Sequence, residues 1–181
     1  MSKRAHTILL AAFLAALCLL PGTAVAQSTG GAQYQPPPEK ATIVNGRAVA
    51  PANAPDAVRR IIAAGNRIVE KPYRYGGGHA KFADTGYDCS GTVSYALRGA
   101  RLLDRPLDSS DFMSWGQPGK GLWVTVYTNP GHAYMIVAGL RLDTGFRDAY
   151  GRKHGAKPGS GPRWGRPRPT DGYTARHPLD L

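Results

Sequence analysis

The sequence predicts an α+β domain, with helices in its first half and an antiparallel sheet in its second half. Apolar residues between Val58 and Val69 recur at helical spacing. A second helix is expected to begin around Cys89. From Leu122 to Thr144 the chain becomes rich in β-forming residues, interrupted by turn signals. A length of 181 residues suits one such domain.

The N-terminal 26 residues have the pattern of a secretory signal peptide. Lys3 and Arg4 precede an apolar run over residues 8–20, and cleavage is expected after Ala26, in a small-residue tripeptide. The run is shorter than the ~20 residues that span a bilayer. We therefore expect a secreted or periplasmic protein without stable membrane insertion. Cys18 follows Leu17 rather than a small residue, which argues against a lipoprotein site.

The cysteine count and the net charge indicate which covalent links and which binding partners are expected. Loss of the leader leaves Cys89 as a single thiol, without a disulfide partner. The formal net charge of +11 falls by two, to +9, when Lys3 and Arg4 are removed. A surface with this charge favours binding to anionic wall polymers or acidic lipids. The basic residues lie in Pro/Gly-rich tail sequence without a module of stacking aromatics, so no nucleic-acid partner is expected.

The expected elements follow in order along the chain. Residues 27–52 are interpreted as a flexible linker because they are rich in Gln, Gly, Ala and Pro. The domain is predicted over 53–181, with Asn53 or Asp56 capping its first helix, which ends before Pro72. A glycine-rich loop then leads to the second helix, which Gly99 terminates.

The second half begins with a short helical turn from Ser109 to Trp115. Three strands are expected over 122–128, 132–138 and 141–144, with turns at 129–131 and near Gly139. From about residue 146 to 181 we expect an irregular basic extension wrapped on the domain and pinned by Trp164 and Tyr173.

Cys89 is the candidate nucleophile because a thiol at a helix N-terminus has a lowered pKa. A nucleophilic thiol also needs a histidine from elsewhere in the fold. His132 opens a convincing strand directly after a turn, where a scaffold can hold its imidazole rigidly. The other histidines of the mature chain lie in loops or tail, although His79 precedes the nucleophile in its own loop; they are His79, His154 and His177.

The histidine needs a group that orients its second ring nitrogen. If a two-residue turn falls at Ala138-Gly139, Asp143 lies opposite Tyr134 and becomes the diagonal neighbour of His132. A turn one residue longer or shorter would place Asp143 on the other face, where it would only cap the strand end. One cysteine and scattered histidines supply no ligand spacing for zinc, so no metal or other cofactor is expected.

The segments Tyr73-Arg74-Tyr75-Gly76-Gly77 and Asp88-Cys89-Ser90-Gly91, followed by His132 at the start of a strand, resemble the NlpC-type cell-wall cysteine peptidases of the papain-like superfamily. The resemblance covers roughly residues 55–145. It implies a papain-like α+β fold and a secreted, wall-associated enzyme. Its partner would be bacterial peptidoglycan, in which it would hydrolyse amide bonds of stem peptides, commonly after γ-linked D-glutamate.

The resemblance also implies roles for individual residues. Tyr73 would help to stabilise the oxyanion, and Asp88 and Ser90 would contact the free amine of the stem. The third catalytic position is often histidine in that family, and Asp143 stands in its place here. Two alternatives stay open, an amidase or transpeptidase on the same scaffold and a catalytically silent wall-binding module. The sequence gives no indication of oligomeric state.

Overall fold

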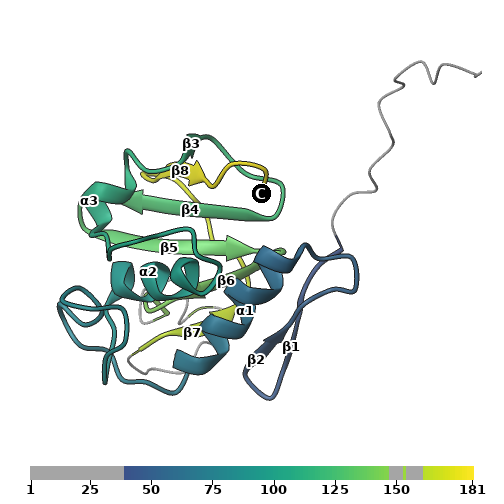
Figure 1. The fold of residues 1–181 in the computed structure, drawn as a ribbon, viewed down its shortest axis with the longest axis horizontal. Coiled ribbons are helices and arrows are strands. Elements are labelled where there is room, and N and C mark those ends of the chain that lie inside the picture. Colours follow the sequence, from purple (N-terminus) through teal and green to yellow (C-terminus); the bar gives the residue numbers. More distant parts are fainter. Residues whose placement is uncertain (1–38, 147–152, 154–160) are drawn as a thin grey trace, which may run out of the picture. The chain divides into compact units, whose positions relative to one another are not determined.

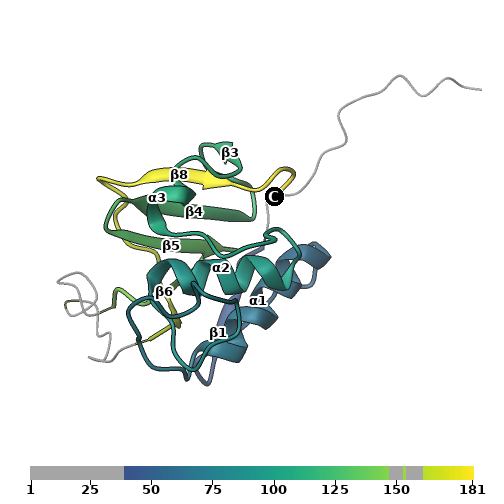
Figure 2. The ribbon, with the colours of Figure 1, turned by 60° about the vertical axis from the view of Figure 1, so that its left-hand side comes forward.

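The computed structural model describes residues 39–146, 153 and 161–181, and its architecture is the predicted α+β. Helices α1 (Asp56–Ile68) and α2 (Cys89–Gly99) lie on one face of an antiparallel sheet (Figures 1 and 2). In the described part of the chain, no helix combines the length and apolarity needed to cross a bilayer. The expected signal peptide and the first part of the expected linker lie outside the described residues.

The sheet has six strands in the order β3-β8-β4-β5-β6-β7. Its strands are β3 (Gln117–Pro118), β4 (Val124–Asn129), β5 (His132–Val137), β6 (Leu140–Asp143), β7 (Arg163–Gly165) and β8 (Thr174–His177). The three predicted strands are β4, β5 and β6, and the predicted helical turn is α3 (Ser109–Phe112).

The expectation of an irregular tail after residue 146 is wrong for two segments. β7 pairs with β6 and β8 pairs with β4, so the C-terminal part of the chain supplies strands at both sides of the predicted hairpins. These strands have three and four residues in Gly-, Pro- and Arg-rich surroundings. Their pairing comes from the backbone of the neighbouring strands, which local residue patterns do not reveal.

The core fills the space between the helices and one face of the sheet. Side chains alternate along a strand, so Val126, Met135 and Leu142 point towards the helices and are buried there. On α1, the face that packs into this core carries the predicted apolar residues Val58, Ile61, Ile62 and Ile68. The opposite face of the sheet therefore carries the other half of each strand, including His132 and Asp143.

The linker expectation for 27–52 is wrong in its last part, because β1 (Thr42–Val44) and β2 (Arg47–Val49) form a hairpin. Asn45-Gly46, both with positive φ, make its turn. The predicted cap of α1 is also wrong: the N-cap is Pro55, without a side-chain hydrogen bond. Asp56 is instead the first helical residue and pairs with Arg59 at 3.0 Å.

Asn66 joins three elements that are distant in the sequence. Its side-chain amide exchanges two hydrogen bonds with the backbone of Ala48 in β2, at 2.9 and 2.8 Å. Its oxygen also accepts from the indole N–H of Trp164 in β7 at 2.9 Å. One residue of α1 therefore ties the N-terminal hairpin and an edge strand to the helix.

Candidate active site

The N-terminus of α2 places Cys89 at the first helical position. Asp88 is the N-cap: its Oδ1 accepts from the N–H of Gly91 at 2.8 Å, and its carbonyl accepts from the hydroxyl of Thr92 at 2.6 Å. The first N–H groups of a helix have no partner inside it. Those of Cys89 and Ser90 are therefore available beside the thiol, where the helix dipole favours negative charge.

The turn between β4 and β5 fixes His132. The side-chain oxygen of Asn129 accepts from the N–H groups of Gly131 and His132, at 3.0 and 2.9 Å. Asn129 and His132 are also paired partners at the end of the two strands. The end of the hairpin therefore holds the backbone of His132 rigidly, as the sequence predicted.

The β5–β6 hairpin has the two-residue turn at Ala138-Gly139, because Val137 pairs with Leu140. Both turn residues have positive φ, 44° and 81°, which the twist of a tight hairpin requires. This register brings Asp143 to the His132 face of the sheet. The Nε2 of His132 lies 2.8 Å from Oδ1 of Asp143, so the geometric expectation for Asp143 is met.

Cys89 and His132 lie together at the junction of α2 and β5. The Cys89 thiol lies close enough to the His132 side chain and to the backbone N–H of Ala133 for both to lower its pKa. Because Nε2 of His132 contacts Asp143, its Nδ1 is the ring nitrogen left for Cys89. The single thiol and the histidine, 43 positions apart in the printed sequence, thus share one site.

The two groups shift each other's ionisation in opposite directions. Burial alone would raise the pKa of Cys89, but the hydrogen bonds from His132 and Ala133 lower it below its usual value. Burial alone would lower the pKa of His132, but the hydrogen bonds to Asp143 and Cys89 raise it to about 9. The arrangement therefore favours the thiolate–imidazolium form of the pair over the neutral form.

Both oxygens of Asp143 have defined neighbours. Oδ1 accepts from the N–H of Gly145 at 2.7 Å in addition to contacting His132. Oδ2 lies 3.2 Å from Nη1 of Arg141 in an ion pair that is almost wholly buried. A Cβ on Gly145 would lie 2.9 Å from His132 Nε2, so this position must be glycine for the pair to meet undisturbed.

Cys89 lines an open cavity of about 490 Å³. The cavity is lined by Tyr73, Tyr75, Gly76, His79, Asp88, Cys89, Ser90, Asp108, Ser109, Ser110, Pro130 and Gly131. Two of these residues are acidic, and no lysine or arginine is among the described residues that line it. The local charge is therefore opposite in sign to that of the whole chain.

Tyr73 stands at the rim of this cavity with 42% of its surface exposed. Burial, together with the negative charge of Cys89 and Asp88, raises the pKa of Tyr73. Its hydroxyl is therefore a hydrogen-bond donor over the physiological pH range.

His79 joins the two predicted substrate-binding residues. Its Nε2 lies 3.0 Å from Oδ1 of Asp88 and 3.1 Å from Oγ of Ser90. A carboxylate only accepts, so Nε2 carries the proton in this contact. The other oxygen of Asp88 accepts from the N–H of Gly76 at 3.0 Å. Asp88 thus serves as helix cap and loop anchor besides lining the cavity.

The C-terminal segment contributes an aromatic neighbour of His132 that sequence reasoning missed. The ring of Tyr173 lies edge-on to His132 and Tyr134, with centroids 6.3 and 5.1 Å apart. Arg168 lies over the ring of Tyr173, at 5.7 Å from its centroid. Only the pairing of β8 with β4 brings this segment to the site. His177 is remote from the chemistry and contacts the carbonyl of Pro178, and His154 lies outside the described residues.

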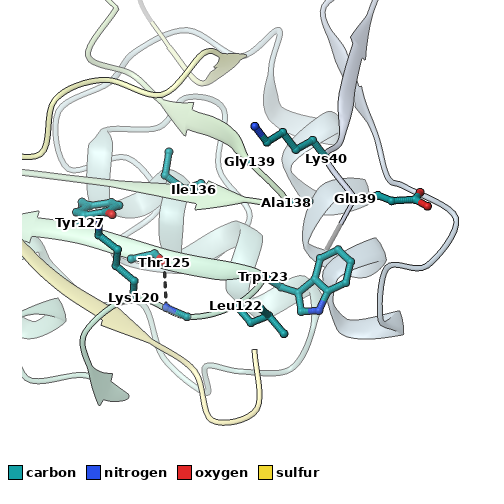
Figure 3. A pocket seen from close by; sticks show the side chains of 11 residues that line it. Glu39, Lys40, Lys120, Leu122, Trp123, Thr125, Tyr127, Ile136, Ala138 and Gly139 are labelled. Carbon is teal, nitrogen blue, oxygen red and sulfur yellow. Dashed lines mark hydrogen bonds between the residues drawn. The ribbon is translucent and has the colours of Figure 1, made fainter. Parts of the chain in front are cut away.

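A second cavity of about 280 Å³ lies elsewhere in the fold (Figure 3). Its walls include Trp123, Tyr127, Lys40 and Lys120, and it contains neither Cys89 nor His132. Over residues 39–146, 153 and 161–181, no three His, Cys, Asp or Glu side chains gather as ligands for a metal ion.

No protein-family model matches the chain. No curated protein matches it either.

Solved structures are similar to part of the chain. RipB, a peptidoglycan hydrolase of Mycobacterium tuberculosis, is 19% identical, with a TM-score of 0.48 over 71% of this chain and 68% of RipB. A hypothetical invasion protein of the same organism is 22% identical, with a TM-score of 0.45; the match covers 66% of this chain and 61% of that one. The P60 domain of an antigen from M. avium subspecies paratuberculosis is 19% identical, with a TM-score of 0.44 over 66% and 93%.

Proposed function

We propose that this chain is a cysteine peptidase that hydrolyses amide bonds in peptidoglycan stem peptides, after γ-linked D-glutamate. The observation that carries the proposal is the meeting of Cys89, His132 and Asp143 at the N-terminus of α2, beside an open cavity. A thiolate, an imidazolium and a carboxylate in this order are the groups that acyl transfer by cysteine requires.

In the proposed mechanism, the thiolate of Cys89 attacks the scissile carbonyl and forms a carbon–sulfur bond. The backbone N–H of Cys89 and the hydroxyl of Tyr73 donate to the oxygen that becomes negative. The imidazolium of His132 gives its proton to the leaving amine, and the carbon–nitrogen bond breaks. Neutral His132 then takes a proton from water, whose oxygen attacks the thioester, and the carboxylic acid leaves while the Cys89 thiolate returns.

The charge of the cavity supports a substrate with a free amine. Asp88 and Asp108 line it without a compensating lysine or arginine among the described lining residues. A stem peptide that ends in an ammonium group suits such a surface, and we assign its contacts to Asp88 and Ser90. The positive charge of the rest of the chain suits the anionic polymers of the wall. We place the enzyme outside the cytoplasm, secreted or periplasmic, after removal of residues 1–26.

The test is mass spectrometry of purified peptidoglycan digested by the protein. We expect soluble fragments cut on the carboxyl side of γ-D-glutamate, and none from Cys89→Ala or His132→Ala. Cleavage at the bond between sugar and peptide would instead identify an amidase, and newly joined peptides a transpeptidase. Wall binding without any covalent change would identify a silent binding module and reject the proposal.

A further inference from the structure

We propose that Arg141 is a positioning residue of this site, whose buried positive charge holds the Asp143 carboxylate beside His132 and so strengthens the contact between Asp143 and His132. The role of the site as a peptidase is the proposed function above, on which the catalytic meaning of this inference rests. The electrostatic part can be tested on Cys89 itself, without any substrate.

The two carboxylate oxygens of Asp143 have different partners. Oδ1 contacts Nε2 of His132 at 2.8 Å, and Oδ2 lies 3.2 Å from Nη1 of Arg141. The contact with Arg141 is an ion pair rather than a directional hydrogen bond, so Arg141 acts on the carboxylate through its charge.

Burial strengthens the effect of the Arg141 charge on Asp143. Arg141 and Asp143 are each only 1% exposed, so water does not solvate either group. A charge in such surroundings acts strongly on its neighbours, so Arg141 adds to the support that His132 and the N–H of Gly145 give the Asp143 carboxylate. With Arg141 present, positive and negative charges alternate from Arg141 through Asp143 and His132 to Cys89.

The guanidinium of Arg141 packs against an aromatic ring. The ring of Phe146 lies over it, 3.9 Å from its centroid, which is a cation–π contact at close range. Gly165 of β7 is the register partner of Arg141, and a Cβ there would lie 2.3 Å from the Phe146 ring. Because Gly165 has no side chain, the Phe146 ring has room to lie over Arg141.

Other ionisable groups face the pair from each neighbouring element. β5 supplies His132 and Tyr134, and β7 supplies Arg163, the register partner of Asp143. The C-terminal segment supplies Arg168 and Tyr173, which lie against Tyr134. Asp143 forms ion pairs with His132 and with Arg141, and of these two partners Arg141 is the one that is almost wholly buried and permanently charged.

The experiment measures the rate of Cys89 alkylation by iodoacetamide against pH in the full-length protein, with the Cys89 peptide quantified by mass spectrometry. Removing a buried cation raises the pKa of the neighbouring acids. We expect Arg141→Gln to move the acid limb of the profile upward by about one pH unit or more. Arg141→Lys keeps the charge and should restore most of the wild-type profile. In an Asp143→Asn background, Arg141→Gln should add less than half of this shift, because Arg141 acts through Asp143.

Arg98 provides the matched control. Arg98 also pairs with a carboxylate, that of Asp104 at 3.7 Å, and its guanidinium lies 5.3 Å from the centroid of the Phe82 ring. Unlike Arg141, it lies at the far end of α2 from Cys89, and its side chain is half exposed. Arg98→Gln should leave the profile unchanged.

A folded Arg141→Gln protein with the wild-type alkylation profile would overturn the inference. So would an Arg141→Gln shift that is equally large in the Asp143→Asn background and in the wild-type background. If Arg141→Gln does not fold, an Arg141→Lys profile displaced as far as that of Asp143→Asn would overturn it. A shifted alkylation profile without any peptidoglycan cleavage by the wild type would uphold the electrostatic inference and reject the proposed function.

Discussion

The Nε2 atom of His132 lies 2.8 Å from Oδ1 of Asp143, across two neighbouring strands of the sheet. This contact settles which ring nitrogen faces each partner, and it leaves Nδ1 for Cys89. The consequences of that arrangement can be measured in three ways, and a fourth prediction concerns the stability of the fold.

The pH dependence of cleavage should reflect the thiolate–imidazolium pair. The pKa of Cys89 is lowered, so the thiolate forms below the usual pH for a thiol, and the pKa of His132 is raised to about 9, so the imidazolium persists until that pH. Activity should therefore rise at a pH below the usual range of a thiol and fall only near pH 9. Initial rates of fragment release measured from pH 4 to 11, roughly the range that brackets both limbs, check this. A fall near the ordinary histidine pKa would contradict the pairing.

Asp143→Asn should slow cleavage without abolishing it. An amide can still contact Nε2, but it carries no charge, so the pKa of His132 falls towards its usual value and less thiolate–imidazolium pair is present. We expect kcat to fall roughly 10²-fold. The alkaline limb of the pH profile should move to lower pH in the same variant. Unchanged kcat and an unchanged alkaline limb would show that another group orients His132.

Gly145→Ala should disturb the same contact by steric means. The added methyl would lie 2.9 Å from His132 Nε2 and 3.1 Å from either oxygen of Asp143, so the pair must move apart. A displacement of this kind costs on the order of 10²-fold in kcat.

The control for this variant is Gly46→Ala in the β1–β2 turn. A Cβ at position 46 meets no atom within 4 Å, although φ is +77°. This control should lose about 1 kcal/mol of stability and no activity. Equal kcat in both variants would mean that the close approach at Gly145 is not needed.

Asn66→Ala should lower the stability of the fold rather than the chemistry. The change leaves the indole N–H of Trp164 and both backbone groups of Ala48 without their partner. We expect the free energy of unfolding to fall by about 2–3 kcal/mol. Urea titration followed by tryptophan fluorescence measures it. Activity per folded molecule should stay at the wild-type level, and a selective loss of activity would contradict a purely structural role.

Much of the site could be predicted because its parts have strong local signals. Asp88-Cys89 after a glycine-rich loop marks a helix N-terminus, and Asn129-Pro130-Gly131 before His132 marks a turn into a strand. The position of Asp143 depended on one assumption, a two-residue turn, which the register confirms. The cap of α1 could not be predicted in this way, because Pro55 occupies the position without a capping side chain.

The sequence alone determined the α+β class, α1, α2 and the three central strands, and it identified Cys89, His132 and Asp143 as the candidate residues. Periodicity, turn residues and helix-start signals are local, so neighbouring residues suffice to express them. Tertiary structure decided that β7 and β8 join the sheet, that Tyr173 borders His132 and that Arg141, which lies against the Phe146 ring, pairs with Asp143. These contacts join segments that are far apart or lack regular patterns, and they exist only because the sheet register and the burial of charge place them together.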